Sequence, residues 1–271
     1  MINNKNIRVA LISPRAVASE KMIRRVQPPL GLCCLAASLR KEGFKNILRY
    51  DTLIEDYNNV RKLKNHDDMI TYGSSDEKIL EKLKSFKPDI VGVSALFSSQ
   101  ISQAYAVARV VKKYNKKTPV VFGGIHASDK PEEVLNEETS VDYIMRGEGD
   151  YTWGTLINEM FNNGSLEKVP GLVWRKNDGF NKNLMAPLIH DMDALPIPAW
   201  DLVPMEEYFK IAMYHNPYVK SGRVGCIMTS RGCPDRCYFC ASTEFFGHKF
   251  RQISPERVGE MVDYLVNKFQ I

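Results

Sequence analysis

Three cysteines lie within eight residues of one another, at Cys233, Cys237 and Cys240. Thiolates are soft ligands that suit iron–sulfur clusters or zinc, and three of them on one short loop can converge on a cube of iron and sulfide. A cube held by three thiolates keeps one iron open for a substrate or cofactor, much as catalytic metal sites keep an open position. The spacing therefore predicts a [4Fe–4S] cluster on these residues.

Two other interpretations of this loop remain open. A structural zinc site would need a fourth ligand, for which His248 is the nearest candidate, although the paired Cys-x2-Cys halves of zinc knuckles are absent. An accidental trio of buried thiols is the other interpretation. Cys33 and Cys34 stand in an apolar helical pattern, and we expect them to be inert core residues.

The composition is that of a globular protein without a strongly charged partner. The 271 residues are 44% hydrophobic and 25% charged, with a formal net charge of +5, so no nucleic-acid partner is expected. The densest basic group is interpreted as a solvated turn at a helix end; it comprises Lys112, Lys113, Lys116 and Lys117.

The same sequence predicts a cytoplasmic protein without a membrane partner. The apolar run at residues 9–12 is too short for a signal peptide, and no apolar stretch is long enough to cross a bilayer. In a reducing compartment clustered cysteines bind metal more often than they form disulfides, which supports the cluster prediction.

Strands and helices alternate through residues 1–165. Helices are expected from Pro28 to about Glu42, over 76–86 and 100–114, after Pro131, and up to about Asn162. The expected strands are Ile7–Ile12, Ile47–Tyr50, Ile90–Ser94, Val120–Phe122 and Tyr143–Met145. This alternation predicts an α/β domain with a flavodoxin-like, doubly wound, five-stranded parallel sheet, and the polar stretch 55–75 is expected to cross its surface irregularly.

Small residues follow three of these strands. In doubly wound sheets ligands bind beyond the carboxyl ends of the strands, and small residues let a ligand approach the backbone. The alternative is that the glycines only serve tight turns between strand and helix. The candidate cofactor contacts at these ends are Ser94, Ala95, Gly123, Gly124, His126, Gly147 and Glu148.

The pattern changes after residue 165. Residues 166–222 are expected to hold a β-hairpin around Asp178-Gly179 and an extended, Pro-rich linker at 194–204. Residues 223–271 are expected to form one β/α unit: a strand at Val224–Thr229, the cysteine loop, and a helix at Pro255–Phe269 that is capped by Ser254.

Several segments, in this order, resemble the cobalamin-dependent radical S-adenosylmethionine (SAM) enzymes. The cysteine loop, with Phe239 before its last cysteine, is similar to the radical SAM signature, and Thr229-Ser230-Arg231-Gly232 is similar to its lead-in. Residues 28–32, 121–127 and 146–150 are similar to the cobalamin-binding domain of that family, and residues 193–198 are similar to its linker.

The resemblance implies specific chemistry. The open iron of the cluster would bind SAM, and one electron would cleave SAM to a 5′-deoxyadenosyl radical that abstracts hydrogen from an unactivated carbon. Cobalamin would carry a methyl group or, in some relatives, assist a ring closure. An external electron donor and a small-molecule substrate are implied as partners, and the protein would supply positioning and exclusion of solvent.

The chain departs from the family in two ways. It lacks the Asp-x-His-x-x-Gly motif that supplies a lower cobalt ligand in many cobalamin proteins, so we expect no histidine on cobalt; His126 is the one substitute. One β/α unit cannot close a radical SAM barrel, so we expect these 271 residues alone to show little turnover. The alternative function is a non-catalytic module that binds cobalamin and the cluster.

Overall fold

The computed structural model describes residues 4–63, 66–216 and 218–271. A sheet in the order β10-β9-β8-β7-β6-β1-β3 forms the centre of the molecule. Its five parallel strands confirm the doubly wound fold: β3 (Asn46–Asp51), β1 (Arg8–Ser13), β6 (Ile90–Ser94), β7 (Val120–Gly123) and β8 (Tyr143–Met145). Taken in chain order, these strands are arranged 2-1-3-4-5, so the strand order reverses between β1 and β6.

The sheet is two strands wider than the sequence predicts. The expected hairpin forms as β9 (Leu172–Lys176) and β10 (Gly179–Lys182), but β9 pairs antiparallel with β8. The hairpin after residue 165 thus extends the sheet, because β8 would otherwise leave its outer edge unpaired.

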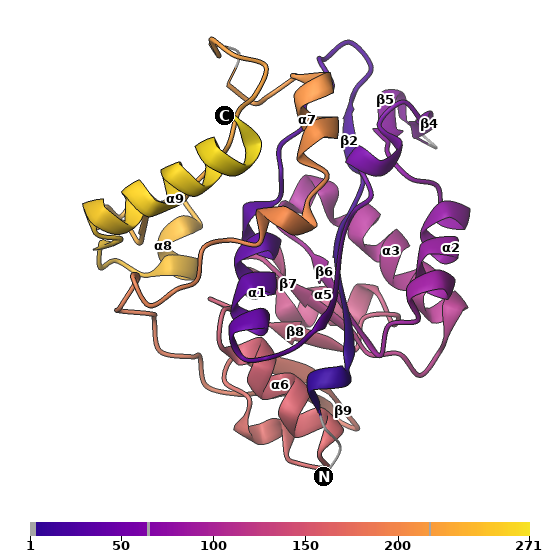
Figure 1. The fold of residues 1–271 in the computed structure, drawn as a ribbon. Helices are drawn as coiled ribbons and strands as arrows, with labels where there is room; N and C mark the ends of the chain where they lie inside the picture. The colour runs from indigo at the N-terminus through magenta and orange to yellow at the C-terminus, as the bar shows by residue number, and fades with distance from the viewer. Residues whose placement is uncertain (1–3, 64–65, 217) are drawn as a thin grey trace.

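Helices cover both faces of this sheet (Figure 1). Alternate residues of β1 explain the two layers: Val9 and Leu11 face one core and Ala10 and Ile12 the other. The first core contains α1 (Leu30–Lys41) and α6 (Thr152–Phe161), and the second contains α2 (Asp76–Phe86), α3 (Ile101–Tyr114) and α5 (Pro131–Glu137). A short helix, α4 (Ile125–Asp129), follows the end of β7.

The expectation of an irregular surface segment at 55–75 was wrong. This stretch contains η2 (Ile54–Asp56), β4 (Val60–Leu63) and β5 (His66–Tyr72), and β5 pairs with β2 (Ala16–Ser19) in a separate antiparallel sheet. Residues 64 and 65 lie outside the described residues. The polar sequence concealed these strands because only the end of β5 is buried, while its pairing partner β2 is distant in the sequence.

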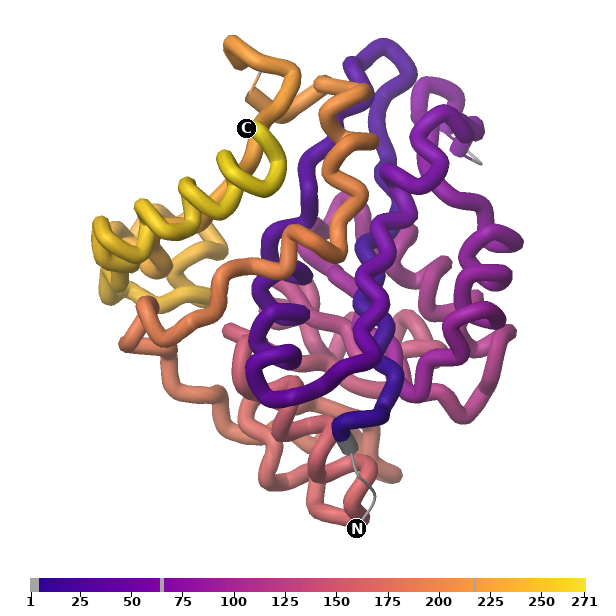
Figure 2. The backbone as a smooth tube through the Cα atoms, in the orientation of Figure 1, coloured from indigo at the N-terminus to yellow at the C-terminus, as the bar shows by residue number. Residues whose placement is uncertain are grey.

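The Pro-rich linker is packed rather than freely extended. It contains η5 (Trp200–Leu202) and leads into α7 (Met205–Ile211), and Trp200 and Tyr208 are buried beside Val26 and Cys33. Figure 2 shows the linker passing along the molecule from the hairpin to α7. Three further short 3-10 turns are η1 (Asn4–Asn6), η3 (Ser98–Gln100) and η4 (Leu166–Lys168).

The expected strand at Val224–Thr229 is also absent. Ile227 packs against α9 (Pro255–Phe269), and no strand among the described residues runs beside this segment to complete its backbone hydrogen bonds. Pairing begins one residue later, where β11 (Ser230–Arg231) meets β12 (Arg251–Gln252), with α8 (Ser242–Phe246) between them. The predicted cap of α9 is confirmed, since the Arg257 amide donates to Ser254 Oγ at 3.2 Å.

In the part of the chain that the structure describes, no helix combines the length and apolar character needed to cross a membrane.

Candidate functional site

The cysteine loop joins β11 to β12. All six cysteines of the chain are free thiols; Cys237 is exposed, and Cys233 and Cys240 are half-buried. Across residues 4–63, 66–216 and 218–271, no three side chains of the metal-binding types converge as a metal site would require. Three accessible soft thiolates are a chemically suitable donor set for a cluster. Their convergence on one cluster would therefore require the loop to rearrange.

The base of this loop is more constrained than its tip. The Cys233 amide donates to the Gly247 carbonyl oxygen at 3.2 Å. Gly232 has φ +87, and a Cβ at this position would overlap the Lys249 carbonyl, so only glycine fits here. Tyr238 and Phe239 are 100% and 80% exposed. Cys233 is thus held at the base, while Cys237 and Cys240 lie toward a solvent-facing tip.

Four of the predicted cofactor contacts lie together at the ends of two adjacent strands. Ser94 pairs in register with Gly123, and the Ala95 amide donates to the Gly123 carbonyl at 2.7 Å. Gly124 has φ +108, and a Cβ there would lie 2.8 Å from the Ala95 carbonyl oxygen. The turn geometry by itself therefore requires glycine at 124, whereas a Cβ at Gly123 would come no closer than 3.6 Å to Met145 O.

His126 stands on the next turn of chain, in α4. Its Nδ1 lies 2.9 Å from the Oγ of Ser98, the first residue of η3. Helix α4 also packs against α8, the helix that follows Cys240. The cysteine segment therefore contacts the carboxyl edge of the sheet through these two helices.

Gly147 and Glu148 follow the end of β8. The Gly147 amide donates to Ser128 Oγ at 3.1 Å, which ties this loop to the end of α4. The Glu148 carboxylate is buried and accepts from Arg251 Nη1 and Nη2 at 3.0 and 2.8 Å. It also accepts from the Ile189 amide at 2.9 Å. Its oxygens are thus occupied by protein groups rather than directed toward the ends of β6 and β7.

A second ion pair lies beside the first. Arg231 Nη1 and Nη2 donate to Asp150 Oδ2 and Oδ1 at 2.8 and 3.2 Å, and both side chains are less than a tenth exposed. The pKa of Arg231 is raised even though burial opposes its charge, because it is hydrogen-bonded to Asp150. Residues 146–150 are thereby joined to the two strands that flank the cysteine loop.

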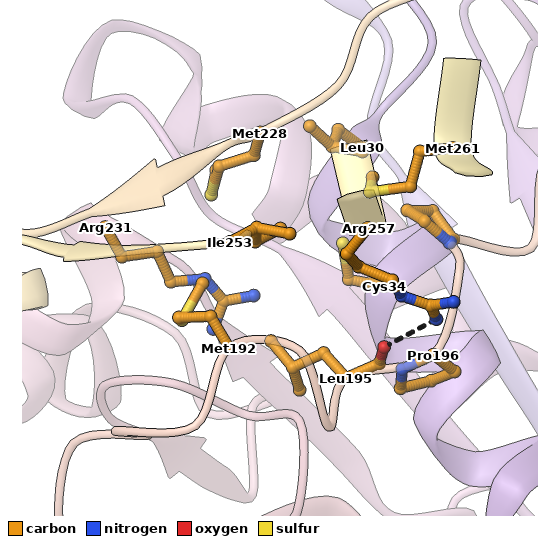
Figure 3. Close-up of a pocket in the computed structure, with 11 residues that line it drawn as sticks. Leu30, Cys34, Met192, Leu195, Pro196, Met228, Arg231, Ile253, Arg257 and Met261 are labelled. Atoms are coloured by element: carbon orange, nitrogen blue, oxygen red, sulfur yellow. Dashed lines mark hydrogen bonds between the residues drawn. The ribbon is translucent and has the colours of Figure 1, made fainter. Parts of the chain in front are cut away.

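The linker, α1, α9 and the cysteine segment meet at a cavity of about 20 Å³ (Figure 3). Arg231 passes along it beside Met192 and Ile253. This volume holds about one water molecule, so the cavity is not the binding site of a large cofactor. Desolvation raises the pKa of Cys34, which lines the cavity, to about 12, and that of buried Cys33 likewise to about 12. Their predicted inert character is consistent with these values.

A larger hollow of about 410 Å³ is lined by residues of the 151–155 segment and of the chain at 186–191. Its lining is mainly apolar, and none of the predicted cofactor contacts contributes to it. The hollow therefore does not bring the predicted cofactor contacts together.

Sequence reasoning assigned no role to the arginines at 231 and 251 or to Asp150. Arg231 and Asp150 lie in segments that resemble the cobalamin-dependent radical SAM enzymes, but a resemblance of separate segments does not identify which side chains pair. A second missed group is buried where α7 covers the end of β3: Tyr208 donates to Asp51, which pairs with Arg49 at 3.4 Å. Burial raises the pKa of Asp51, and Arg49 and the Tyr208 hydroxyl oppose that rise.

Comparison with known sequences identifies the sheet domain. A family model of the B12 binding domain matches residues 23–157. Cytidylyl-2-hydroxyethylphosphonate methyltransferase of Streptomyces wedmorensis is 31% identical, over 97% of this chain and 54% of that protein. An uncharacterized methyltransferase of Pyrococcus horikoshii is 33% identical, over 96% and 50%. Anaerobic magnesium-protoporphyrin IX monomethyl ester cyclase of Rubrivivax gelatinosus is 27% identical, over 98% and 44%. The chain thus spans about half the length of the curated relatives it matches.

Solved structures share the fold. The cobalamin-dependent SAM radical enzyme OxsB, with aqua-cobalamin and SAM bound, superimposes with a TM-score of 0.74 at 20% identity, over 98% of this chain and 32% of that one. The radical SAM methyltransferase TsrM of Kitasatospora setae, with cobalamin and a [4Fe–4S] cluster bound, gives 0.66 at 18% identity, over 97% and 46%. The chain therefore contains a B12-binding domain at residues 23–157 and shares the fold of cobalamin-dependent radical SAM enzymes.

Proposed function

We propose that this chain forms the cobalamin- and cluster-binding part of a radical SAM enzyme that transfers a methyl group to an unactivated carbon of a small molecule. One observation supports the proposal above others: the cysteine loop is held against the carboxyl edge of the sheet through α4, α8 and two buried ion pairs. Methyl transfer is favoured over ring closure because two relatives above 30% identity are named as methyltransferases, while the Rubrivivax gelatinosus cyclase is 27% identical.

The proposed roles divide the chain into three parts. Residues 1–165 would hold cobalamin at the ends of β6 and β7, with Ser94, Ala95, Gly123, Gly124 and His126 nearest to it. Residues 166–222 would link this domain to residues 223–271, where Cys233, Cys237 and Cys240 would hold the cluster. When bound, the cluster supplies the electron that cleaves SAM, and cobalamin supplies a carrier for the methyl group.

The protein's own contribution would be orientation. Phe239 is exposed beside Cys240, where it can cover one side of a cluster-bound ligand. Gly123 leaves the backbone at the end of β7 accessible to a large planar ligand. An external electron donor and a small-molecule substrate would complete the reaction in the cytoplasm.

Anaerobic reconstitution tests the cluster half of the proposal. Incubation of the 271-residue chain with iron and sulfide should incorporate about four irons per chain. Simultaneous replacement of Cys233, Cys237 and Cys240 by Ala should abolish this, while Cys33→Ala, as a matched control, should not. Stoichiometric zinc uptake without iron would contradict the cluster assignment.

Calorimetric titration with hydroxocobalamin tests the other half. Binding to the folded chain is expected, and the triple cysteine variant should retain it because the proposed cobalamin contacts lie on other loops. If the chain is well folded but does not bind cobalamin, the proposed cobalamin-binding role of the sheet domain is wrong.

A further inference from the structure

We propose that the Asp150–Arg231 and Glu148–Arg251 pairs form a two-point latch that orients the cysteine loop toward the carboxyl edge of the sheet. The two arginines would then be positioning residues for the reaction between the cluster-bound ligand and cobalamin. This inference rests on the proposed function and extends it by assigning roles to residues outside the ligand sets.

The two ion pairs set both the orientation of the β11–β12 ribbon and its distance from residues 148–150. Arg231 and Arg251 are opposite each other in the β11–β12 pair, and the two acidic residues are separated by only Gly149. Each arginine makes a bidentate contact, with donor–acceptor distances from 2.8 to 3.2 Å. A guanidinium fork meets a carboxylate in one plane, so two adjacent forks prevent the ribbon from turning about either contact.

Both stems of the cysteine loop begin at this latch. Cys233 lies two residues after Arg231 in β11, and the loop ends at Arg251 in β12. Arg251 also donates to the Phe246 carbonyl at the end of α8, at 2.7 Å, and to the Ile189 carbonyl in the linker, at 2.6 Å. Arg251 therefore contacts Glu148 after β8, the linker, and the helix that follows Cys240.

Stability alone is a poor explanation of this arrangement. All four side chains are less than a tenth exposed, and apolar residues of similar volume often join segments at least as stably as a buried ion pair does. What a paired fork adds is angular specificity, which a reaction between two bound cofactors requires.

The first test uses the ligand-free chain, so that it does not depend on cofactor binding. In Arg231→Gln and Arg251→Gln, hydrogen exchange at the hydrogen-bonded amides of Cys233, Ile253 and Gly147 should accelerate on the order of a hundredfold, with β1 and β3 unchanged. Arg223→Gln is the matched control, because Arg223 forms a bidentate pair with the exposed Glu206 in the same part of the fold. Exchange like that of the control, or an even loosening of the whole sheet, would overturn the latch.

The second test uses the chain loaded with a reconstituted cluster and cob(II)alamin. Arg231→Lys keeps the charge and loses the fork. It should load iron and cobalamin like the unmodified chain, but the reduced cluster should enhance the electron-spin relaxation of cob(II)alamin several-fold less. Joint replacement of Asp150 by Arg and of Arg231 by Asp should restore part of the effect. Full enhancement in Arg231→Lys would refute the positioning role. If the unmodified chain loads neither cofactor, the proposed function fails, while the exchange experiment still decides whether the latch exists.

Discussion

Ser98 Oγ and His126 Nδ1 are 2.9 Å apart, which connects the loop after β6 to the helix after β7. If the hydroxyl donates to Nδ1, the Nε2 atom of neutral His126 carries the proton and has no lone pair for a metal. If Nδ1 carries the proton and donates to Ser98, Nε2 keeps the lone pair that a metal ligand needs, so the two tautomers of His126 make opposite predictions for cobalt.

Electron paramagnetic resonance of bound cob(II)alamin tests this directly. Because the chain lacks the Asp-x-His-x-x-Gly motif, we expect no nitrogen hyperfine splitting from His126, and His126→Gln should leave the spectrum unchanged. Ser98→Ala is the informative companion, since it frees Nδ1. A splitting that is present in the unmodified chain and lost in His126→Gln would identify the histidine as a cobalt ligand.

Gly123 and Gly124 form a matched pair for locating cobalamin. Gly123→Ala should change the free energy of unfolding by less than about 0.5 kcal/mol, because its Cβ meets only Met145 O at 3.6 Å. It should weaken hydroxocobalamin binding on the order of tenfold if the ligand reaches the backbone at β7. Titration calorimetry and urea unfolding measure both effects, and unchanged affinity would place cobalamin elsewhere.

Gly124→Ala should behave differently. Its φ of +108 and its 2.8 Å approach to Ala95 O predict a destabilisation of about 1–3 kcal/mol. Weaker cobalamin binding in this variant would report on folding as well as on ligand contact, so Gly123 is the sharper probe.

Alkylation should separate Cys33 and Cys34 from the three cysteines of the loop. With the pKa of Cys33 and of Cys34 at about 12, few thiolates form near neutral pH, and reaction should be slower than at an ordinary thiol on the order of a thousandfold. Iodoacetamide labelling followed by peptide mass spectrometry should modify the loop cysteines, with Cys237 first. A reconstituted cluster should protect all three, and labelling of Cys33 at the loop rate without denaturant would contradict its buried position.

Tyr208→Phe should reveal the buried carboxylate at the end of β3. It removes a donor to the buried Asp51 carboxyl group and should cost about 1–3 kcal/mol near pH 7. Because the folded-state pKa of Asp51 is raised, its ionisation lowers stability as pH rises from the unfolded value of about 3.9 through the folded one. Loss of the Tyr208 donor raises that pKa further, so the cost should shrink toward about pH 4.

Urea unfolding at the two pH values measures this difference. Tyr214→Phe is the control, since Tyr214 donates to the uncharged Gly222 carbonyl at 2.5 Å and its cost should not vary with the ionisation of Asp51. An equal cost of Tyr208→Phe at both pH values would show that Asp51 is not the titrating partner.

Local sequence determined the parts of this protein that depend on neighbouring residues. The apolar runs specified the parallel strands, and Ser254 with Pro255 specified the start of α9; the hairpin predicted around Asp178-Gly179 forms with its turn one residue earlier, at 177–178. The spacing of the cysteines predicted one loop carrying all three thiols. Each of these features is encoded within a few residues, through side-chain periodicity, turn geometry or capping.

Only the tertiary structure decided which distant groups meet. Asp150 and Arg231 are 81 residues apart, and Glu148 and Arg251 are 103 apart, so nothing local selects these pairs over other charged residues. The same holds for the small β2–β5–β4 sheet, and for the failure of Val224–Thr229 to form a strand, because pairing requires a neighbour that the segment does not specify. Long-range partners are chosen by the packing of whole elements, and that packing places a glycine-rich segment of the cobalamin-binding domain against both stems of the cysteine loop.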